Sequence, residues 1–238
     1  MDTSKYSYEP LDPTKRSLRL LRLRRGGGQE IQCELIPTTF GDELQYDAVS
    51  YTWGPDFKAA TVNIDGKKLS ITFNLNLILQ DLRSLEVDRI LWVDAICIDQ
   101  SNEVEKGHQV QQMRDIFRSA ERVLFCISRP TEHTDLLMDS LGKLQEKLQR
   151  LDLEWDSIET CWKEAQLELA DNHLSSVSEQ IKALTFLQRQ ALEYILGQSW
   201  FKRVWIIQEV ANARDALVYC GSRHVSATVF VSHVPIEA

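Results

Sequence analysis

The segment Arg89-Ile-Leu-Trp-Val-Asp94 is a short, nearly continuous apolar run, which is typical of a strand buried on both faces in a parallel sheet. A helical pattern follows over residues 103–120, and Asn102 and Glu105 are spaced as in a capping box at its start. Arg122-Val-Leu-Phe-Cys-Ile127 is a second buried run. A strand, a helix of this length and another strand form a βαβ unit, so part of the sheet is predicted to be parallel.

Strand patterns fill the sequence before this unit. Residues 17–25 and 31–36 are predicted to pair as a hairpin that turns at Gly26-Gly27-Gly28. Residues 46–54 read as a third strand, and residues 61–71 as a second hairpin that turns at an Asp-Gly pair. The triple glycine is not a phosphate-binding loop, because no Gly-Lys-Ser/Thr follows it.

Helical periodicity marks three further segments. A leucine-rich stripe over residues 75–85 has Asn74 as its expected N-cap. Residues 131–196 have a helical pattern along most of their length. Residues 199–211 are apolar almost all round, so we expect one buried helix there.

These elements predict an α/β fold, with α+β as the alternative. We expect a partly parallel central sheet with a flavodoxin-like βαβ core, N-terminal β-hairpins and a helical insertion. The chain has 238 residues, which favours one large domain over several. We expect a single domain over residues 1–238, made of a β-rich part (1–73), the βαβ core (74–130), the insertion (131–196) and a last helix and strand (197–230).

The charge is concentrated in one segment. The chain has a net charge of −8, and residues 131–196 carry 6 basic and 13 acidic side chains, a net charge of −7. The overall balance does not favour a protein that coats nucleic acid or an anionic membrane. No apolar stretch is long enough to span a bilayer, the N-terminus lacks the apolar core of a secretory signal, and the five scattered cysteines form no CxxC pair. We therefore expect a cytoplasmic protein with reduced thiols.

A basic strand offers one weaker alternative. Arg19, Arg22, Arg24 and Arg25 lie close together, as in a nucleic-acid patch. At this net charge we favour a solvated strand face, and we expect no nucleic-acid partner.

Three blocks of sequence, taken in order, resemble the fungal heterokaryon-incompatibility (HET) domain. The first is Tyr46-Asp-Ala-Val-Ser-Tyr-Thr-Trp-Gly54. The second is Leu91-Trp-Val-Asp-Ala-Ile-Cys-Ile-Asp-Gln100, continued by Glu105-Lys-Gly-His-Gln-Val110. The third is Trp200-Phe-Lys-Arg-Val-Trp-Ile-Ile-Gln-Glu-Val210. The resemblance covers about residues 8–230.

The resemblance implies an effector of fungal self/non-self recognition, a form of innate immunity, whose activation triggers programmed cell death. It also implies that the protein forms a homo-oligomer on activation and meets a recognition protein, for example one of the NLR type. Lys106, where the family usually has arginine, and Asp99, where asparagine is common, are small departures.

A more distant resemblance links the sequence to TIR domains. Residues 46–51 are similar to the first TIR strand, and Trp205-Ile-Ile-Gln-Glu209 is similar to the helix that holds the catalytic glutamate of NAD-cleaving TIR enzymes. A hairpin follows Trp53 here, where a TIR domain enters a helix directly, and the helical insertion has no TIR counterpart. The resemblance implies a TIR-like core and NAD as a substrate, with no tightly bound cofactor.

Glu209 is the candidate catalytic residue, and two interpretations of it stay open. In the first, its carboxylate holds the ribose of NAD and stabilises positive charge on the ribosyl carbon as nicotinamide leaves. In the second, it is a buried glutamate that pairs with Arg203 or Arg122 and holds its helix in place.

The other candidates would bind NAD around this carboxylate. Asp94 follows a predicted parallel strand, at the edge where open α/β sheets place their ligands. Asp99 and Gln100 lie in the loop beyond it, although for Asp99 we favour loop capping. The full set of NAD-binding candidates is Trp53, Asp94, Asp99, Gln100, Arg203 and Trp205. We expect no metal site, because His108 has no second ligand at helical spacing.

Two functional hypotheses therefore remain. The first is a TIR-like NAD glycohydrolase that kills by consuming NAD. The second is a non-enzymatic module that induces cell death by assembling with copies of itself or with a partner.

Overall fold

The computed structural model describes residues 5–12, 14–42, 44–55, 58–151, 158–169 and 176–233. The chain divides into two compact units. The first consists of Met1–Phe125 and Arg203–Asp215, and the second of Cys126–Lys202 and Ala216–Ala238. The predicted insertion lies within the second unit, and the predicted last segment is divided between the two.

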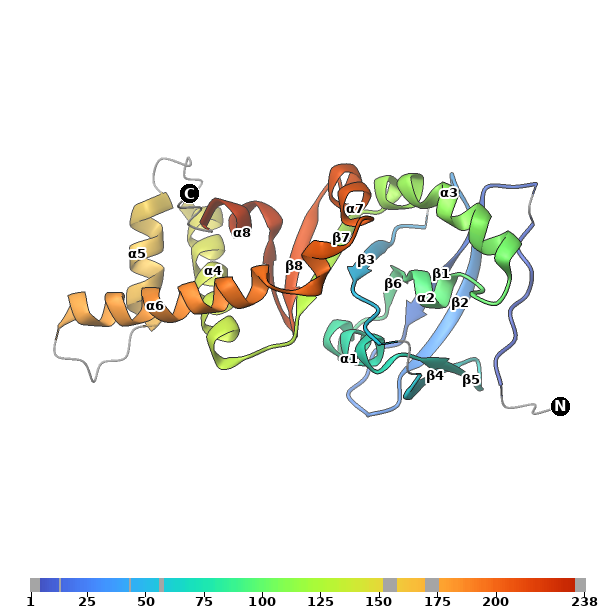
Figure 1. Ribbon diagram of the computed structural model, residues 1–238, viewed down its shortest axis with the longest axis horizontal. Coiled ribbons are helices and arrows are strands. Elements are labelled where there is room, and N and C mark those ends of the chain that lie inside the picture. Colours follow the sequence, from blue (N-terminus) through green and yellow to red (C-terminus); the bar gives the residue numbers. More distant parts are fainter. Residues whose placement is uncertain are drawn as a thin grey trace. The chain divides into compact units, whose positions relative to one another are not determined.

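The first unit is built on a mixed sheet with the strand order β5-β4-β2-β1-β6-β3-β7 (Figure 1). The pairs β1–β2, β1–β6 and β4–β5 are antiparallel, whereas β2–β4 and β3–β6 are parallel. The predicted α/β class with a partly parallel sheet is therefore confirmed. The strands are β1 (Ser17–Leu23), β2 (Gln32–Thr39), β3 (Asp47–Tyr51), β4 (Ala60–Ile64), β5 (Lys67–Ile71), β6 (Arg89–Trp92) and β7 (Arg122–Ser128), and the unit boundary falls within β7.

Both predicted hairpins are present. β1 and β2 pair from Ser17 opposite Thr39 to Leu23 opposite Cys33, so the glycine-containing segment closes this hairpin. β4 and β5 are joined by Asp65 (φ 50°) and Gly66 (φ 83°). A two-residue turn with positive φ at both positions matches the twist of its strands, and Asp-Gly tolerates that backbone conformation.

The βαβ elements are present, with two corrections. β6 and β7 both neighbour β3 and not each other. A short helix, α2 (Asp94–Cys97), occupies part of the segment that was predicted as a loop. It forms because the amides of Ile96 and Cys97 donate to the Val93 carbonyl at 3.0 and 2.7 Å. Asp94 therefore begins a helix instead of ending the strand.

α3 (Glu103–Ser119) is the predicted long helix, and Asn102 is its N-cap. Its inner face packs on the sheet, where Phe117 meets the buried ring of Trp92 edge-on at 5.6 Å between centroids. The Tyr46 hydroxyl donates to the Ile116 carbonyl at 2.6 Å and ties the helix to the segment before β3.

α1 (Phe73–Leu82) begins at a different cap from the predicted one. The Thr72 hydroxyl accepts a hydrogen bond from the Leu75 amide at 3.2 Å, so Thr72 is the N-cap. Asn74 instead donates its side-chain amide to the Thr52 carbonyl. Thr72 and Asn74 are both capping residue types, and the contact with Thr52 decides between them.

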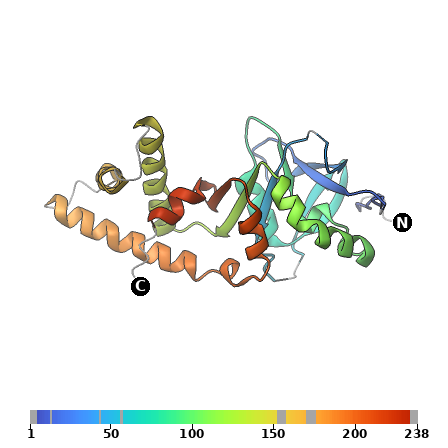
Figure 2. The same cartoon turned by 90° about the horizontal axis from the view of Figure 1, so that it is seen from above.

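The second unit contains the helices α4 (Glu132–Leu151), α5 (Ile158–Leu169), α6 (Val177–Leu196) and α8 (Ala227–His233), with a 3₁₀ turn η2 (Ser199–Lys202) and the strands β8 (Ala216–Cys220) and β9 (Arg223–Ser226) (Figure 2). A buried polar chain joins three of the helices. Gln166 of α5 donates to Gln188 of α6 at 2.7 Å, and Gln188 donates to Ser140 of α4 at 2.8 Å. Because buried amides need partners, these two hydrogen bonds specify how the three helices align.

No helix in the described part of the chain is both long and apolar enough to cross a membrane.

Arg19 contradicts the predicted solvated face of β1. Its side chain is 2% exposed, and its guanidinium binds both oxygens of Glu105 at 2.5 and 2.9 Å. It also donates to the carbonyls of Glu9 (2.6 Å) and Cys97 (3.1 Å) and lies over the ring of Tyr8 at 5.0 Å. Burial acts to lower the pKa of Arg19, but its hydrogen bonds and ion pair with Glu105 outweigh this and raise it.

Glu105 therefore completes only half of the predicted capping box. Asn102 accepts hydrogen bonds from the amides of Val104 (3.2 Å) and Glu105 (3.1 Å), as expected. The Glu105 carboxylate does not return to the Asn102 amide, which donates to the Asp99 carbonyl instead. The reason is that the buried Arg19 requires a counter-charge more strongly than the helix end requires a second cap.

We predict that Arg19→Met lowers the free energy of unfolding by about 3–5 kcal/mol, because it leaves the Glu105 carboxylate buried without its counter-charge. Denaturant unfolding measures the loss. Arg22→Met is the matched control, since Arg22 is 33% exposed in its pair with Glu34, and it should change stability by less than about 1 kcal/mol. Adding Glu105→Leu to Arg19→Met should restore most of the loss, and equal effects of the two single arginine variants would contradict the prediction.

Candidate functional site

The segment that carries Glu209 is not the single buried helix that was predicted. The 3₁₀ turn η2 ends at Lys202, and α7 (Ile206–Asn212) begins after a turn. Most apolar side chains between residues 203 and 212 are exposed. The exposed fractions are 81% for Val204, 44% for Trp205, 72% for Ile207 and 48% for Val210. The exposure follows from Glu209, which is turned inward and leaves the apolar residues on either side of it facing outward.

Glu209 is 1% exposed and has three hydrogen-bond donors. Arg203 donates to its two carboxylate oxygens at 2.8 and 3.1 Å, and the hydroxyl of Ser50 in β3 donates to one of them. The guanidinium engages the carboxylate as a fork, the geometry that makes such pairs strong. Arg203 itself remains 20% exposed.

The structure also decides between the two proposed partners of Glu209. Arg122 binds Asp47 at 3.0 Å, and Arg89 binds the same carboxylate at 2.9 Å. Arg203 is therefore the partner of Glu209. α7 packs beside α3 within the first unit (Figure 1), and this contact fixes the position of the Arg203–Glu209 pair.

Ser50 is a site residue that sequence reasoning did not single out for this role. It is 1% exposed and lies in β3, every residue of which is buried. A hydroxyl in a fully buried strand must find a hydrogen-bond partner, and this was the available signal. The partner, Glu209, lies 159 positions away in the chain, so only the fold shows which residue it is.

Asp94 and Trp53 do come together. The indole nitrogen of Trp53 donates to one oxygen of Asp94 at 2.8 Å, and the Ala95 amide donates to the other at 2.7 Å. Burial raises the pKa of Asp94, while these two hydrogen bonds and the charge of Arg203 act to lower it and the charge of Glu209 acts to raise it. Asp94 thus lies within electrostatic range of the Arg203–Glu209 pair.

Tyr51 lies next to Ser50 in β3 and belongs to the same neighbourhood. It is 1% exposed, and burial together with the negative charge of Asp94 raises its pKa well above the ordinary value. We use the name Glu209 cluster for the residues Ser50, Tyr51, Trp53, Asp94, Arg203 and Glu209.

Three other candidates have different positions. Asp99 accepts hydrogen bonds from the amide (3.0 Å) and hydroxyl (2.6 Å) of Ser101, which matches the loop-capping interpretation. Gln100 donates to the backbone carbonyl of Asp94 at 2.9 Å and so supports α2. Trp205 is the residue before α7 and is 44% exposed, so its ring is at the surface.

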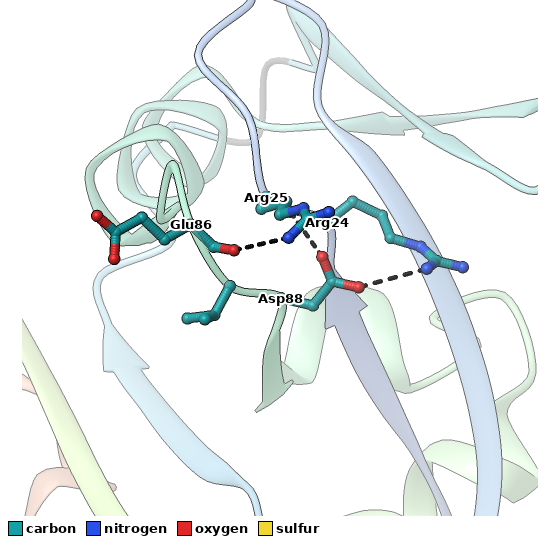
Figure 3. A pocket seen from close by; sticks show the side chains of 5 residues that line it. Arg24, Arg25, Glu86 and Asp88 are labelled. Atoms are coloured by element: carbon teal, nitrogen blue, oxygen red, sulfur yellow. Dashed lines mark hydrogen bonds and ion pairs between the residues drawn. The ribbon is translucent and has the colours of Figure 1, made fainter.

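The arginines at the end of the basic strand pair with neighbouring groups of the same protein. Arg24 pairs with Glu34 at 2.7 Å and with Asp88 at 3.3 Å. Figure 3 shows Arg24 and Arg25 facing Glu86 and Asp88: the Arg25 amide donates to the Asp88 carboxylate, and its side chain donates to the Glu86 carbonyl, both at 2.9 Å. Two of the arginines that suggested a nucleic-acid patch, Arg24 and Arg25, therefore stabilise the loops at this end of the sheet.

Among the described residues, no group of three histidine, cysteine, aspartate or glutamate side chains is placed to hold a metal ion.

Comparison with known proteins places these contacts in a family. The model of the family described as "Heterokaryon incompatibility protein (HET)" matches residues 46–209, which is more than half of the chain. The chain belongs to the HET family. The match begins just before β3 and ends at Glu209, so every residue of the Glu209 cluster lies within the HET domain.

One curated relative is Heterokaryon incompatibility protein 6, OR allele, from Neurospora crassa. The two sequences are 29% identical over 246 aligned positions, which cover 93% of this chain and 36% of the relative. The HET chain thus spans about a third of the length of this relative. No solved structure matches this HET chain.

We predict that Trp53→Phe raises the pKa of Asp94 further, because it removes the indole hydrogen bond that favours the ionised form. A carboxyl NMR titration measures the change. Because the native-state pKa of Asp94 is already above its ordinary value, the stability that Asp94 contributes is present in acid and is lost as the pH rises through that pKa. Trp53→Phe should therefore increase the loss of unfolding free energy as the pH rises from the ordinary pKa of an aspartate to the native-state pKa of Asp94.

Trp205→Phe is the matched control, since it alters an exposed tryptophan outside the Glu209 cluster. An Asp94 titration that is the same in both variants would show that the Trp53 indole does not stabilise the carboxylate.

Proposed function

We propose that this HET domain is the effector part of a fungal incompatibility protein and triggers programmed cell death by cleaving NAD between nicotinamide and ribose. Membership of the HET family and the name of the Neurospora relative support the incompatibility role. The observation that supports the enzymatic role is Glu209, a carboxylate 1% exposed and held by an arginine fork and a serine hydroxyl. Buried carboxylates with specific partners are typical of active sites, although they also occur in structural ion pairs.

The reaction would proceed through positive charge on the ribosyl carbon. The bond to the nicotinamide nitrogen breaks with both electrons going to the ring, which leaves as neutral nicotinamide. Glu209 stabilises the resulting oxocarbenium-like centre. Water then adds its oxygen to that carbon and releases a proton, so that the products are ADP-ribose and nicotinamide.

In this proposal, activation changes the position of Arg203. Both oxygens of Glu209 are occupied, and of its two partners among the described residues Arg203 is 20% exposed whereas Ser50 is 1% exposed. A ribose can reach the carboxylate once this guanidinium moves aside, where it would be free to bind a phosphate of NAD. In this proposal Trp53 and Asp94 bind the nicotinamide riboside part, and assembly into a homo-oligomer, promoted by a recognition partner of the NLR type, provides the trigger.

We predict that clustered wild-type protein releases nicotinamide from NAD and that Glu209→Gln lowers the rate at least about a hundredfold, because the amide cannot stabilise the developing charge. Chromatography of NAD and nicotinamide measures both rates. Glu103→Gln is the matched control, since Glu103 is 80% exposed, and it should keep the wild-type rate.

The shorter carboxylate of Glu209→Asp should retain part of the activity, which separates loss of charge from loss of fold. Circular dichroism checks that each variant is folded. Unchanged NAD with clustered wild-type protein, or an unchanged rate for folded Glu209→Gln, would reject the enzymatic proposal.

A non-enzymatic assembly module is the second candidate, and the outer face of α7 favours it. Ile207 and Val210 lie three positions apart in α7 and are 72% and 48% exposed, and Val204, in the turn before the helix, is 81% exposed. An apolar patch made of such exposed side chains is typical of a surface that another protein covers. In this alternative the Arg203–Glu209 pair only holds α7 in the orientation that presents the patch.

We predict for this alternative that Ile207→Ser weakens self-association of the protein about tenfold or more, because it removes the middle side chain of the patch. Sedimentation velocity over a range of concentrations measures the association constant. Val87→Ser is the control, since Val87 is 60% exposed and lies outside α7, beside Arg24 and Asp88. Self-association that is equal in the two variants would exclude α7 as the assembly surface.

A further inference from the structure

A pocket of about 230 Å³ lies in the first unit, between the N-terminal segment and the beginning of α3. Pro10, Leu11, Asp12 and Ser17 line one side of it, and side chains from the first turns of α3 line the other. None of its lining residues belongs to the Glu209 cluster. We name it the α3 pocket.

Gln109 lines the α3 pocket and has a buried acceptor atom. The residue is 2% exposed, and its side-chain nitrogen donates to the Ser17 carbonyl at 2.7 Å. This bond settles the orientation of the amide, because turning it round would place two oxygens against each other. Its Oε1 atom then has no hydrogen-bond partner among the described residues. A buried acceptor left in this state is unfavourable, because it has lost its hydrogen bond to water without gaining another.

Gln112 presents a second acceptor on the same face of α3. It lies three positions after Gln109 and also lines the pocket. Its Oε1 atom is likewise buried without a hydrogen-bond partner in the described part of the chain. Residues three apart in a helix are neighbours on its surface, so both side chains contribute to the same wall of the pocket.

The charged groups of the pocket are already matched to each other. Glu105 is paired with Arg19 and also accepts from the Asp99 amide at 2.8 Å. Asp12 accepts from the amide and hydroxyl of Thr14, which together with the charge of Lys15 lower its pKa, and Lys15 approaches it at 3.5 Å. Of the groups that line the described pocket, the buried atoms without a partner are thus two neutral oxygens, and His108 is exposed at its rim; this favours an uncharged ligand over a cation or an anion.

We propose that the α3 pocket binds a small molecule with a primary carboxamide. A carboxamide nitrogen supplies two N–H donors without a charge, one for each of the oxygens of Gln109 and Gln112. Pro10, Leu11 and Val104 provide an apolar surface for the rest of the molecule. Water also has two donors and is the competing occupant, but it gains nothing from this apolar surface.

Benzamide and benzoate are the probe pair, because they share size and ring but only benzamide has N–H donors. Isotope-labelled protein is titrated with each, and the amide signals of Ser17, Gln109 and Gln112 are followed by NMR. We expect saturable shifts with benzamide, with a dissociation constant on the order of 1 mM, and binding at least about tenfold weaker with benzoate. The binding needs no catalytic activity, so the experiment gives the same answer whether or not NAD is cleaved.

Gln112→Met is the test variant, since it removes the oxygen while preserving the length of the side chain. We expect it to weaken benzamide binding about tenfold, whereas Gln111→Met, an exposed neighbour outside the pocket, should leave binding unchanged. Absence of saturable shifts would mean that water alone occupies the pocket. Equal binding of benzamide and benzoate, or full binding by folded Gln112→Met, would equally overturn the proposal.

Discussion

A buried carboxylate must have a counter-charge and donors close by, and the first unit meets this requirement in three places. Glu105 binds Arg19, Asp47 binds Arg89 and Arg122, and Glu209 binds Arg203. Removing one partner of such a pair leaves an uncompensated charge in a medium of low dielectric constant, so each pair restricts which elements can move apart. The pairs join β1 to α3, β3 to β6 and β7, and the turn before α7 to its own helix.

The Arg203–Glu209 pair has consequences for both functional hypotheses. It holds the carboxylate against Ser50 and within electrostatic range of Asp94, the position from which the enzymatic proposal starts. The same orientation exposes Ile207 and Val210 on the other side of the helix. One ion pair therefore links a candidate catalytic carboxylate to a candidate assembly surface, and a partner that covers α7 would act directly on the element that holds Glu209.

Sequence reasoning succeeded where local patterns decide the structure. The Asp65-Gly66 turn, the Asn102 cap of α3 and the helical pattern of residues 131–196 all depend on neighbours within a few positions. It failed where a distant group competed with the local pattern. Arg19 looked like part of a solvated face, but the carboxylate of Glu105, 86 positions away, buries it.

The sequence alone determined the family and the class of the fold, and it singled out Glu209 as the candidate catalytic residue, because these inferences depend on ordered motifs and on the periods of apolar residues. Only the tertiary structure decided which arginine binds Glu209, that Ser50 completes its contacts and that Asp94 begins a helix beside Trp53. It also decided which face of α7 is exposed. The physical reason is that a buried charge is stabilised by whichever partner the fold brings within about 3 Å, and separation in the chain does not restrict that choice.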